Sequence, residues 1–148
     1  MFQFFGHKTS AFFDVWSIEH IVSGICCGSF VIWYAKKEKS NLKTIQTQGN
    51  DTRFELVCLL CIAFVWEAFE HYLESGIAGD VVQVWLQGVE AWHNRLVSDP
   101  LMMVIGYFIV RKYPKVIWTA RIFSLTWLVV HIFVFPHSMY LSDVVFRL

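Results

Sequence analysis

Four apolar stretches, each about as long as a membrane-spanning helix, constrain the fold of this chain more than any other feature. They cover residues 12–34, 53–73, 92–110 and 116–136 of the 148, and a helix of about 20 apolar residues crosses a bilayer. Composition agrees, since 56% of the residues are hydrophobic and only 16% are charged, whereas soluble domains carry about 25% charged residues. We therefore expect an all-α membrane protein, a bundle of four transmembrane helices that forms one domain over residues 1–148.

The start of the chain lacks the order of basic, apolar and small residues that marks a cleavable signal peptide, so we expect the first helix to be retained. A less apolar segment, residues 79–92, precedes the third stretch and is expected to form an amphipathic helix at the membrane interface. Its polar side chains recur at spacings of three and four, which places them on one helical face: Asp80, Gln83, Gln87, Glu90 and, just beyond, Asn94. This stripe either faces water or contributes to a site.

Lysine and arginine predict the orientation, because they concentrate in cytoplasmic loops. Nine of the twelve basic residues lie in or beside the two connections around residues 35–53 and 111–121: Lys36, Lys37, Lys39, Lys43, Arg53, Arg111, Lys112, Lys115 and Arg121. Both connections should therefore be cytoplasmic. Both termini and the interfacial helix should lie on the other side of the membrane.

Histidines and acids gather at the opposite level of the predicted bundle. All six histidines fall in the non-cytoplasmic half or beyond it, as do all the acidic residues except Glu38, Asp51 and Glu55. His20 lies about 12 Å into the first span at about 1.5 Å per residue, and a charge at mid-membrane costs about 2.5–3.5 kcal/mol. Polar groups at such depth face the interior of a bundle and indicate a functional site.

Helical spacing groups these residues into candidate metal ligands. Residues that share a face are Ser17 with His20, Glu67 with Glu70 and His71, and Glu90 with His93 and Asn94. Di-metal helix bundles assemble their ligands from a carboxylate and a histidine that lie three positions apart on inward-facing helices. We expect a divalent metal to be bound by five residues: His20, Glu70, His71, Glu90 and His93. Imidazole with carboxylate suits zinc, iron or manganese.

Glu67 and Asp99 are the candidate catalytic residues, as acid or base, and Ser17 and Asn94 are further polar members of the site. Two alternatives to a metal remain open. The cluster either forms ion pairs and hydrogen bonds that hold the helices together, or it moves protons or other ions. Haem between histidines is less attractive because so many carboxylates lie nearby.

Two shorter motifs also bear on the site. Asp99 can cap a helix that begins at Pro100, but from there to Val110 is only about 16 Å, too short to span a bilayer. The third helix therefore either continues through Pro100 with a kink or is broken beside the cluster. Cys58 and Cys61 have the spacing of a metal or redox pair, although thiols in apolar helices more often pack as apolar residues.

Three spaced patterns resemble a known group: Ser17-Ile-Glu-His20 with Gly24, Trp66-Glu-Ala-Phe-Glu70-His71, and Asn94-Arg-Leu-Val-Ser-Asp99 with Gly106-Tyr107. They are similar to those of small, largely uncharacterised bacterial inner-membrane proteins, loosely VanZ-like. The resemblance covers roughly residues 17–114 and implies a bundle of four or five helices in a bacterial inner membrane, with no established activity. His71 and His93 depart from this pattern, because we do not expect histidines at these positions throughout that group.

Two functions follow from these observations. The first is a small metal-dependent membrane enzyme, such as a hydrolase in which metal-bound water attacks a lipid or lipid-linked substrate. The second is a non-enzymatic accessory protein or subunit of a membrane complex, whose polar cluster is structural or handles ions. A formal net charge of zero provides no basic field for nucleic acid, so membrane lipids and other membrane subunits are the expected partners.

Overall fold

The computed structural model describes residues 3–41, 51–86, 88–130 and 133, and over these the protein is mostly helical. Its elements, in chain order, are β1 (Gln3–Phe5), β2 (Ala11–Phe13), α1 (Trp16–Asn41), α2 (Asp51–Glu74), α3 (Asp80–Leu86), the π-helical turn η1 (Asn94–Ser98), α4 (Asp99–Lys112) and α5 (Val116–Val129). The two strands form a small parallel pair, with Gln3 opposite Ala11 and Phe5 opposite Phe13. The sequence did not predict this pair.

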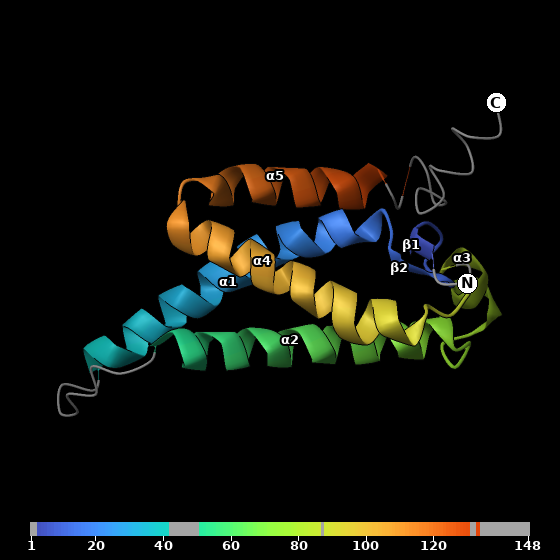
Figure 1. Ribbon diagram of the computed structural model, residues 1–148, viewed down its shortest axis with the longest axis horizontal. Helices are drawn as coiled ribbons and strands as arrows, with labels where there is room; N and C mark the ends of the chain where they lie inside the picture. The colour runs from blue at the N-terminus through green and yellow to red at the C-terminus, as the bar shows by residue number, and fades with distance from the viewer. Residues whose placement is uncertain (1–2, 42–50, 87, 131–132, 134–148) are drawn as a thin grey trace.

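The longer helices pack against one another, with α1 crossing α4 at the centre (Figure 1). The α1–α4 contact is the most extensive, and α1 also contacts α2 and α5. Figure 1 shows β1, β2, α3 and the start of the η1–α4 path together at one end of the molecule, which we call the strand end. The end of α1, the start of α2 and the α4–α5 connection lie at the opposite end, which we call the basic end.

Buried positions on α2 recur at helical spacing and form one inward stripe. The middle of the stripe is apolar, whereas both ends carry carboxylates: Glu55, Leu59, Ala63, Glu67 and Glu74 are all nearly inaccessible to solvent. The other faces of α2 expose large apolar side chains, among them Val65 at 71%. A helix that buries its acids and exposes its apolar residues reverses the usual pattern of a soluble helix.

Two glycines allow α1 and α4 to approach closely. A Cβ atom at Gly24 of α1 would overlap the backbone of Met103, and one at Gly106 of α4 would overlap the backbone of Ile21. Small residues at such crossings let helix backbones pack in contact. The crossing begins one turn from His20 on α1, so it fixes the separation between His20 and the start of α4.

The third apolar stretch is a continuous helical path. Of the two alternatives, a helix through Pro100 and a break, the structure shows the first, because η1 runs directly into α4. The backbone N–H of Asp99 donates to the carbonyl of Asn94, five residues back. Pro100 has no N–H to donate and its ring crowds the carbonyl four residues earlier, so the wider π turn accommodates it.

The helix expected over residues 79–92 is present but shorter. α3 ends at Leu86, and Gly88 has a φ of 103°, a left-handed conformation that interrupts a helix. Glu90 therefore lies in the loop that leads into η1. The prediction of one helical stripe from Asp80 to Asn94 was wrong, because Gly88 changes the chain direction between them.

Two helices are long and apolar enough to cross a membrane, over Trp16–Glu38 and Thr52–Glu74. α5 is apolar but shorter over the described residues, and α4 has 14 residues. Residues 131–132 and 134–136 of the fourth expected span lie outside the described residues. The expected total of four transmembrane helices therefore stays a prediction.

Candidate metal centre

Three helices bring one imidazole and two carboxylates together at the strand end. His20 comes from α1, Glu67 from α2 and Asp99 from the first turn of α4, and all three are buried. His20 Nδ1 lies 3.9 Å from Glu67 Oε1, and His20 Nε2 lies 3.5 Å from Asp99 Oδ2. One ligand atom from each residue lies within 4.8 Å of the other two, which is close enough for one ion to contact all three. We call these residues the triad.

Among the described residues, the carboxylate oxygens of the triad have no hydrogen bond of ordinary geometry, although the Glu90 side chain approaches Asp99. Both oxygens of Glu67 and both oxygens of Asp99 are inaccessible to solvent. Buried polar atoms are normally satisfied, and leaving them unpaired is costly. A cation between the two carboxylates would satisfy them, and the adjacent imidazole nitrogen would complete a three-residue ligand set.

A second acidic group lies nearby but is already neutralised in part. Its members are Glu70, Glu74 and Glu90, whose ligand atoms also lie within 4.8 Å of one another. Glu74 forms ion pairs with Lys8 Nζ and with Arg95, and it accepts a hydrogen bond of 2.9 Å from the backbone N–H of Glu90. Since two cations already contact Glu74, this group has less need of a metal than the triad does.

Negative charge is crowded where the loop meets the triad. Burial raises the pKa of Glu90, and the neighbouring carboxyl groups of Asp99, Glu70 and Glu67 raise it further. The opposing contact is with Arg95, whose Nε lies 3.8 Å from Glu90 Oε2. Such mutual repulsion among buried carboxyl groups favours uptake of a cation or of protons.

Ser17 and Asn94 lie beside the triad and position the start of α1. Asp14 accepts hydrogen bonds from the backbone N–H groups of Trp16 (2.8 Å) and Ser17 (3.1 Å), as a helix cap does. Its other oxygen accepts a hydrogen bond of 3.0 Å from Asn94 Nδ2, and Ser17 Oγ accepts one of 3.1 Å from the Asp14 N–H. This network ties η1 to α1 and therefore Asp99 to His20.

The expected ligands separate into four environments. His20 joins the triad with Glu67 and Asp99, and Glu70 and Glu90 join Glu74. His71 Nδ1 contacts Arg95 Nη1 at 2.7 Å. The ring of His93 stacks on Phe12, with centroids 5.7 Å apart. Over the part of the chain that the structure describes, neither of the two groups that could hold a metal ion includes His71 or His93. All four cysteines, which the structure describes, are free thiols and belong to neither group.

Two basic residues of the site were not predicted. Lys8 is buried beside Glu74 although it belongs to the N-terminal strand region, and no spacing in the sequence links it to α2. Arg95 contacts Glu74, Glu90 and His71, and helical spacing in the sequence does not predict these contacts.

Comparison of the chain with models of protein families, with curated proteins and with solved structures gave no match. The resemblance to the VanZ-like group therefore stays a prediction.

Proposed function

We propose that this protein is a four-helix integral membrane protein that binds one divalent metal ion between His20, Glu67 and Asp99. The observation that carries the proposal is a pair of buried carboxylates that have no hydrogen bond of ordinary geometry among the described residues and that lie on either side of a buried imidazole. Zinc, iron and manganese all accept this mixture of nitrogen and oxygen donors. This ligand set shares only His20 with the five residues expected from the sequence and does not include His71 or His93.

Exposure of apolar side chains supports the membrane location. The apolar window of α2 has a mean hydropathy of 1.7, but only 17% of it is buried inside the protein. The core helix of a soluble protein would be largely buried instead. α5 agrees, since Trp118, Ile122 and Leu125 are each more than 60% exposed. Lipid contact accounts for such surfaces without a further protein partner.

The donor set supports a catalytic use of the metal. Three protein ligands leave at least one coordination position for water or substrate, as in catalytic zinc sites, whereas structural sites use four. A metal in this position would activate water for attack on a substrate and polarise the bond under attack. Because the triad lies between membrane helices near their non-cytoplasmic ends, a lipid or lipid-linked molecule is the substrate class that fits.

A non-enzymatic role is the second candidate, and the ion pairs of Glu74 favour it. Lys8, Glu74 and Arg95 connect the strand region, α2 and η1 through buried charges. Such a network braces the strand end whether or not a metal binds. Under this alternative the triad would hold protons or a structural ion, and the protein would serve as a subunit or accessory of a membrane complex.

Metal analysis of the purified, full-length chain tests the proposal. The detergent-solubilised protein is loaded with zinc, iron or manganese, desalted, and analysed by mass spectrometry of the elements. We expect about one metal ion per chain, its loss in His20→Ala and Glu67→Gln, and its retention in His71→Ala. Gel filtration and thermal unfolding of each variant show whether it is folded.

Two outcomes would contradict the metal site. The first is wild-type protein that retains no metal under any of the three loadings. The second is a folded His71→Ala variant that loses as much metal as His20→Ala does, because His71 would then be a ligand. A metal site without turnover of any lipid substrate would favour the non-enzymatic candidate.

A further inference from the structure

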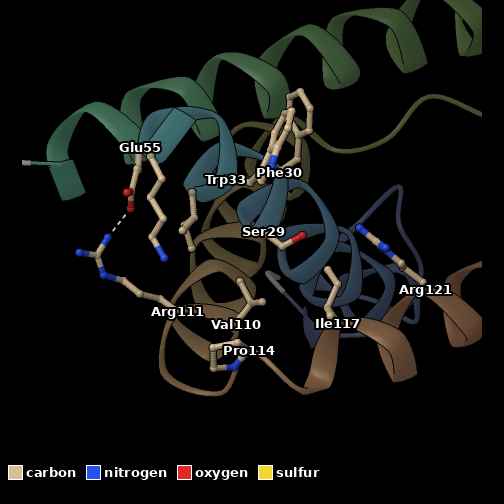
Figure 2. Close-up of a pocket in the computed structure, with 11 residues that line it drawn as sticks. Ser29, Phe30, Trp33, Glu55, Val110, Arg111, Pro114, Ile117 and Arg121 are labelled. Atoms are coloured by element: carbon tan, nitrogen blue, oxygen red, sulfur yellow. Dashed lines mark hydrogen bonds and ion pairs between the residues drawn. The ribbon is translucent and has the colours of Figure 1, made fainter. Parts of the chain in front are cut away.

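A cavity of about 650 Å³ opens at the basic end, far along the helices from the triad (Figure 2). Its walls come from α1, α2, α4, α5 and the α4–α5 connection, with Phe30, Trp33, Val110, Pro114 and Ile117 among the apolar residues. Phe30 and Trp33 are 56% and 54% exposed. The apolar walls are therefore continuous with the exposed apolar surface of the helices, which faces lipid in the proposed membrane location.

Three cations line the same cavity: Lys36, Arg111 and Arg121. Figure 2 shows Arg111 and Arg121 on opposite sides of it, with Val110, Pro114 and Ile117 between them. Among the described residues, Glu55 is the one acid in the lining, and it already accepts hydrogen bonds from Arg111 and from Tyr107 Oη, the latter at 2.6 Å. The cavity therefore presents more positive charge than its own acid neutralises.

The two remaining cations are placed to meet an anion. Lys36 is exposed near the end of α1, and the guanidinium of Arg121 lies over the Trp118 ring at 5.2 Å. Stacking on an aromatic face leaves the N–H groups at the edge of a guanidinium available as donors. Arg121 lies about 8 Å along α5 from its first residue at about 1.5 Å per residue, so its donors lie within the half of α5 that is nearer the basic end.

We propose that this cavity binds an anionic phospholipid. Lys36 and Arg121 contact the phosphate, and the acyl chains lie against Phe30, Trp33 and Ile117. Basic cavities between transmembrane helices on the cytoplasmic side bind anionic headgroups in this way, and the basic end is the cytoplasmic one by the distribution of lysine and arginine. The apolar walls distinguish a lipid from free phosphate, because free phosphate gains nothing from them. The inference rests on the membrane location and is independent of the metal site.

Native mass spectrometry of the detergent-solubilised chain tests this site. The protein is titrated with palmitoyl-oleoyl phosphatidylglycerol, with the phosphatidylcholine of the same chains, and with inorganic phosphate. We expect tighter binding of phosphatidylglycerol than of phosphatidylcholine, and no displacement by millimolar phosphate. Lys36→Gln and Arg121→Gln should each weaken phosphatidylglycerol binding about fivefold, since one basic residue at an anionic lipid surface contributes about that factor.

Lys112→Gln is the matched control, because Lys112 lies at the end of α4 but outside the cavity. It should leave the binding of both lipids unchanged. Equal binding of the two lipids, displacement by phosphate, or the same loss in Lys112→Gln would overturn the proposed site. A chain that stays monodisperse in water without detergent would instead contradict the membrane location.

Discussion

Glu67 and Glu74 lie two turns apart on the same face of α2, but their surroundings differ. Glu74 is held by Lys8 and Arg95, whereas the oxygens of Glu67 have no hydrogen-bond partner among the described residues. Removing one member of a buried ion pair leaves its partner's charge uncompensated, so Glu74 is tied to the stability of the fold. A buried carboxylate without a hydrogen bond is costly, which favours the approach of a cation. We therefore propose Glu74 as a structural residue and Glu67 as a metal ligand.

Glu74→Gln tests the structural assignment. We expect it to lower the free energy of unfolding by about 3–5 kcal/mol, because Lys8 and Arg95 remain buried without their counter-charge. Asp80→Asn is the control, since Asp80 is exposed on α3 and its replacement should change stability by less than about 0.5 kcal/mol. Thermal unfolding in detergent measures both. A Glu74→Gln variant as stable as Asp80→Asn would show that the ion pairs contribute nothing.

The sequence identified the polar residues of the site better than it identified their partners. His20, Glu67 and Asp99 could be selected because each is a costly polar group within an apolar stretch. Spacing alone could not show that His71 meets Arg95 or that His93 stacks on Phe12, since those contacts depend on how far each helix is rotated. Lys8 could not be found at all, because its contact with Glu74 spans 66 residues of sequence.

At the scale of elements, the α1–α4 crossing determines the geometry of the triad. Gly24 and Gly106 bring the two backbones into contact, and the π turn then carries Asp99 to the level of His20. The apolar stretches were sufficient to predict α1 and α2, but the sequence left open whether the third helix continues through Pro100 or is broken there. The π turn and the strand pair were not predictable, because the first depends on packing around Pro100 and the second on a docking surface formed by other elements.

Gly24→Ala tests the crossing. Alanine favours a helix over glycine by about 1 kcal/mol, but its Cβ would overlap the Met103 backbone, and overpacking of this kind costs about 1–3 kcal/mol or more. We expect a net loss of stability together with weaker metal retention, because α1 and α4 must separate.

Gly28→Ala is the control on the same face of α1. Its Cβ would lie 3.0 Å from Tyr107 Cα and 3.2 Å from Tyr107 Cβ, a milder contact farther from the triad. It should affect metal retention less than Gly24→Ala does. Thermal unfolding and elemental analysis of the two purified variants make the comparison, and equal metal retention in both would contradict a role of the crossing in positioning His20 and Asp99.

At the scale of the whole molecule, the two ends differ in the charged and polar groups that they carry. The strand end holds the triad and the Glu74 ion pairs, and the basic end holds the cavity lined by Lys36, Arg111 and Arg121. The end of α1, the start of α2 and the α4–α5 connection lie at the same end of the molecule (Figure 1), which the orientation argument predicts to be cytoplasmic. Among the described residues, two helices are long and apolar enough to cross a membrane. The four apolar stretches of the sequence predict four such helices.

An epitope tag inserted within residues 42–50 tests the orientation. The four basic residues between residues 36 and 43 should keep this connection in the cytoplasm. We expect the tag to be labelled by an impermeant reagent only after the cells are permeabilised. A second tag at the N-terminus, which should be labelled in intact cells, is the control. Labelling of the first tag in intact cells would invert the orientation and move the triad to the cytoplasmic side.

X-ray absorption at the zinc edge of the purified, zinc-loaded chain tests most directly whether His20, Glu67 and Asp99 hold a metal. We expect nitrogen and oxygen donors at about 2.0–2.2 Å, outer-shell scattering from one imidazole per zinc, and no sulfur donor. Glu67→Gln should weaken the bound signal or abolish it. Scattering from two or more imidazoles would show that His71 or His93 ligates the ion, and a chain without bound zinc would contradict the site itself.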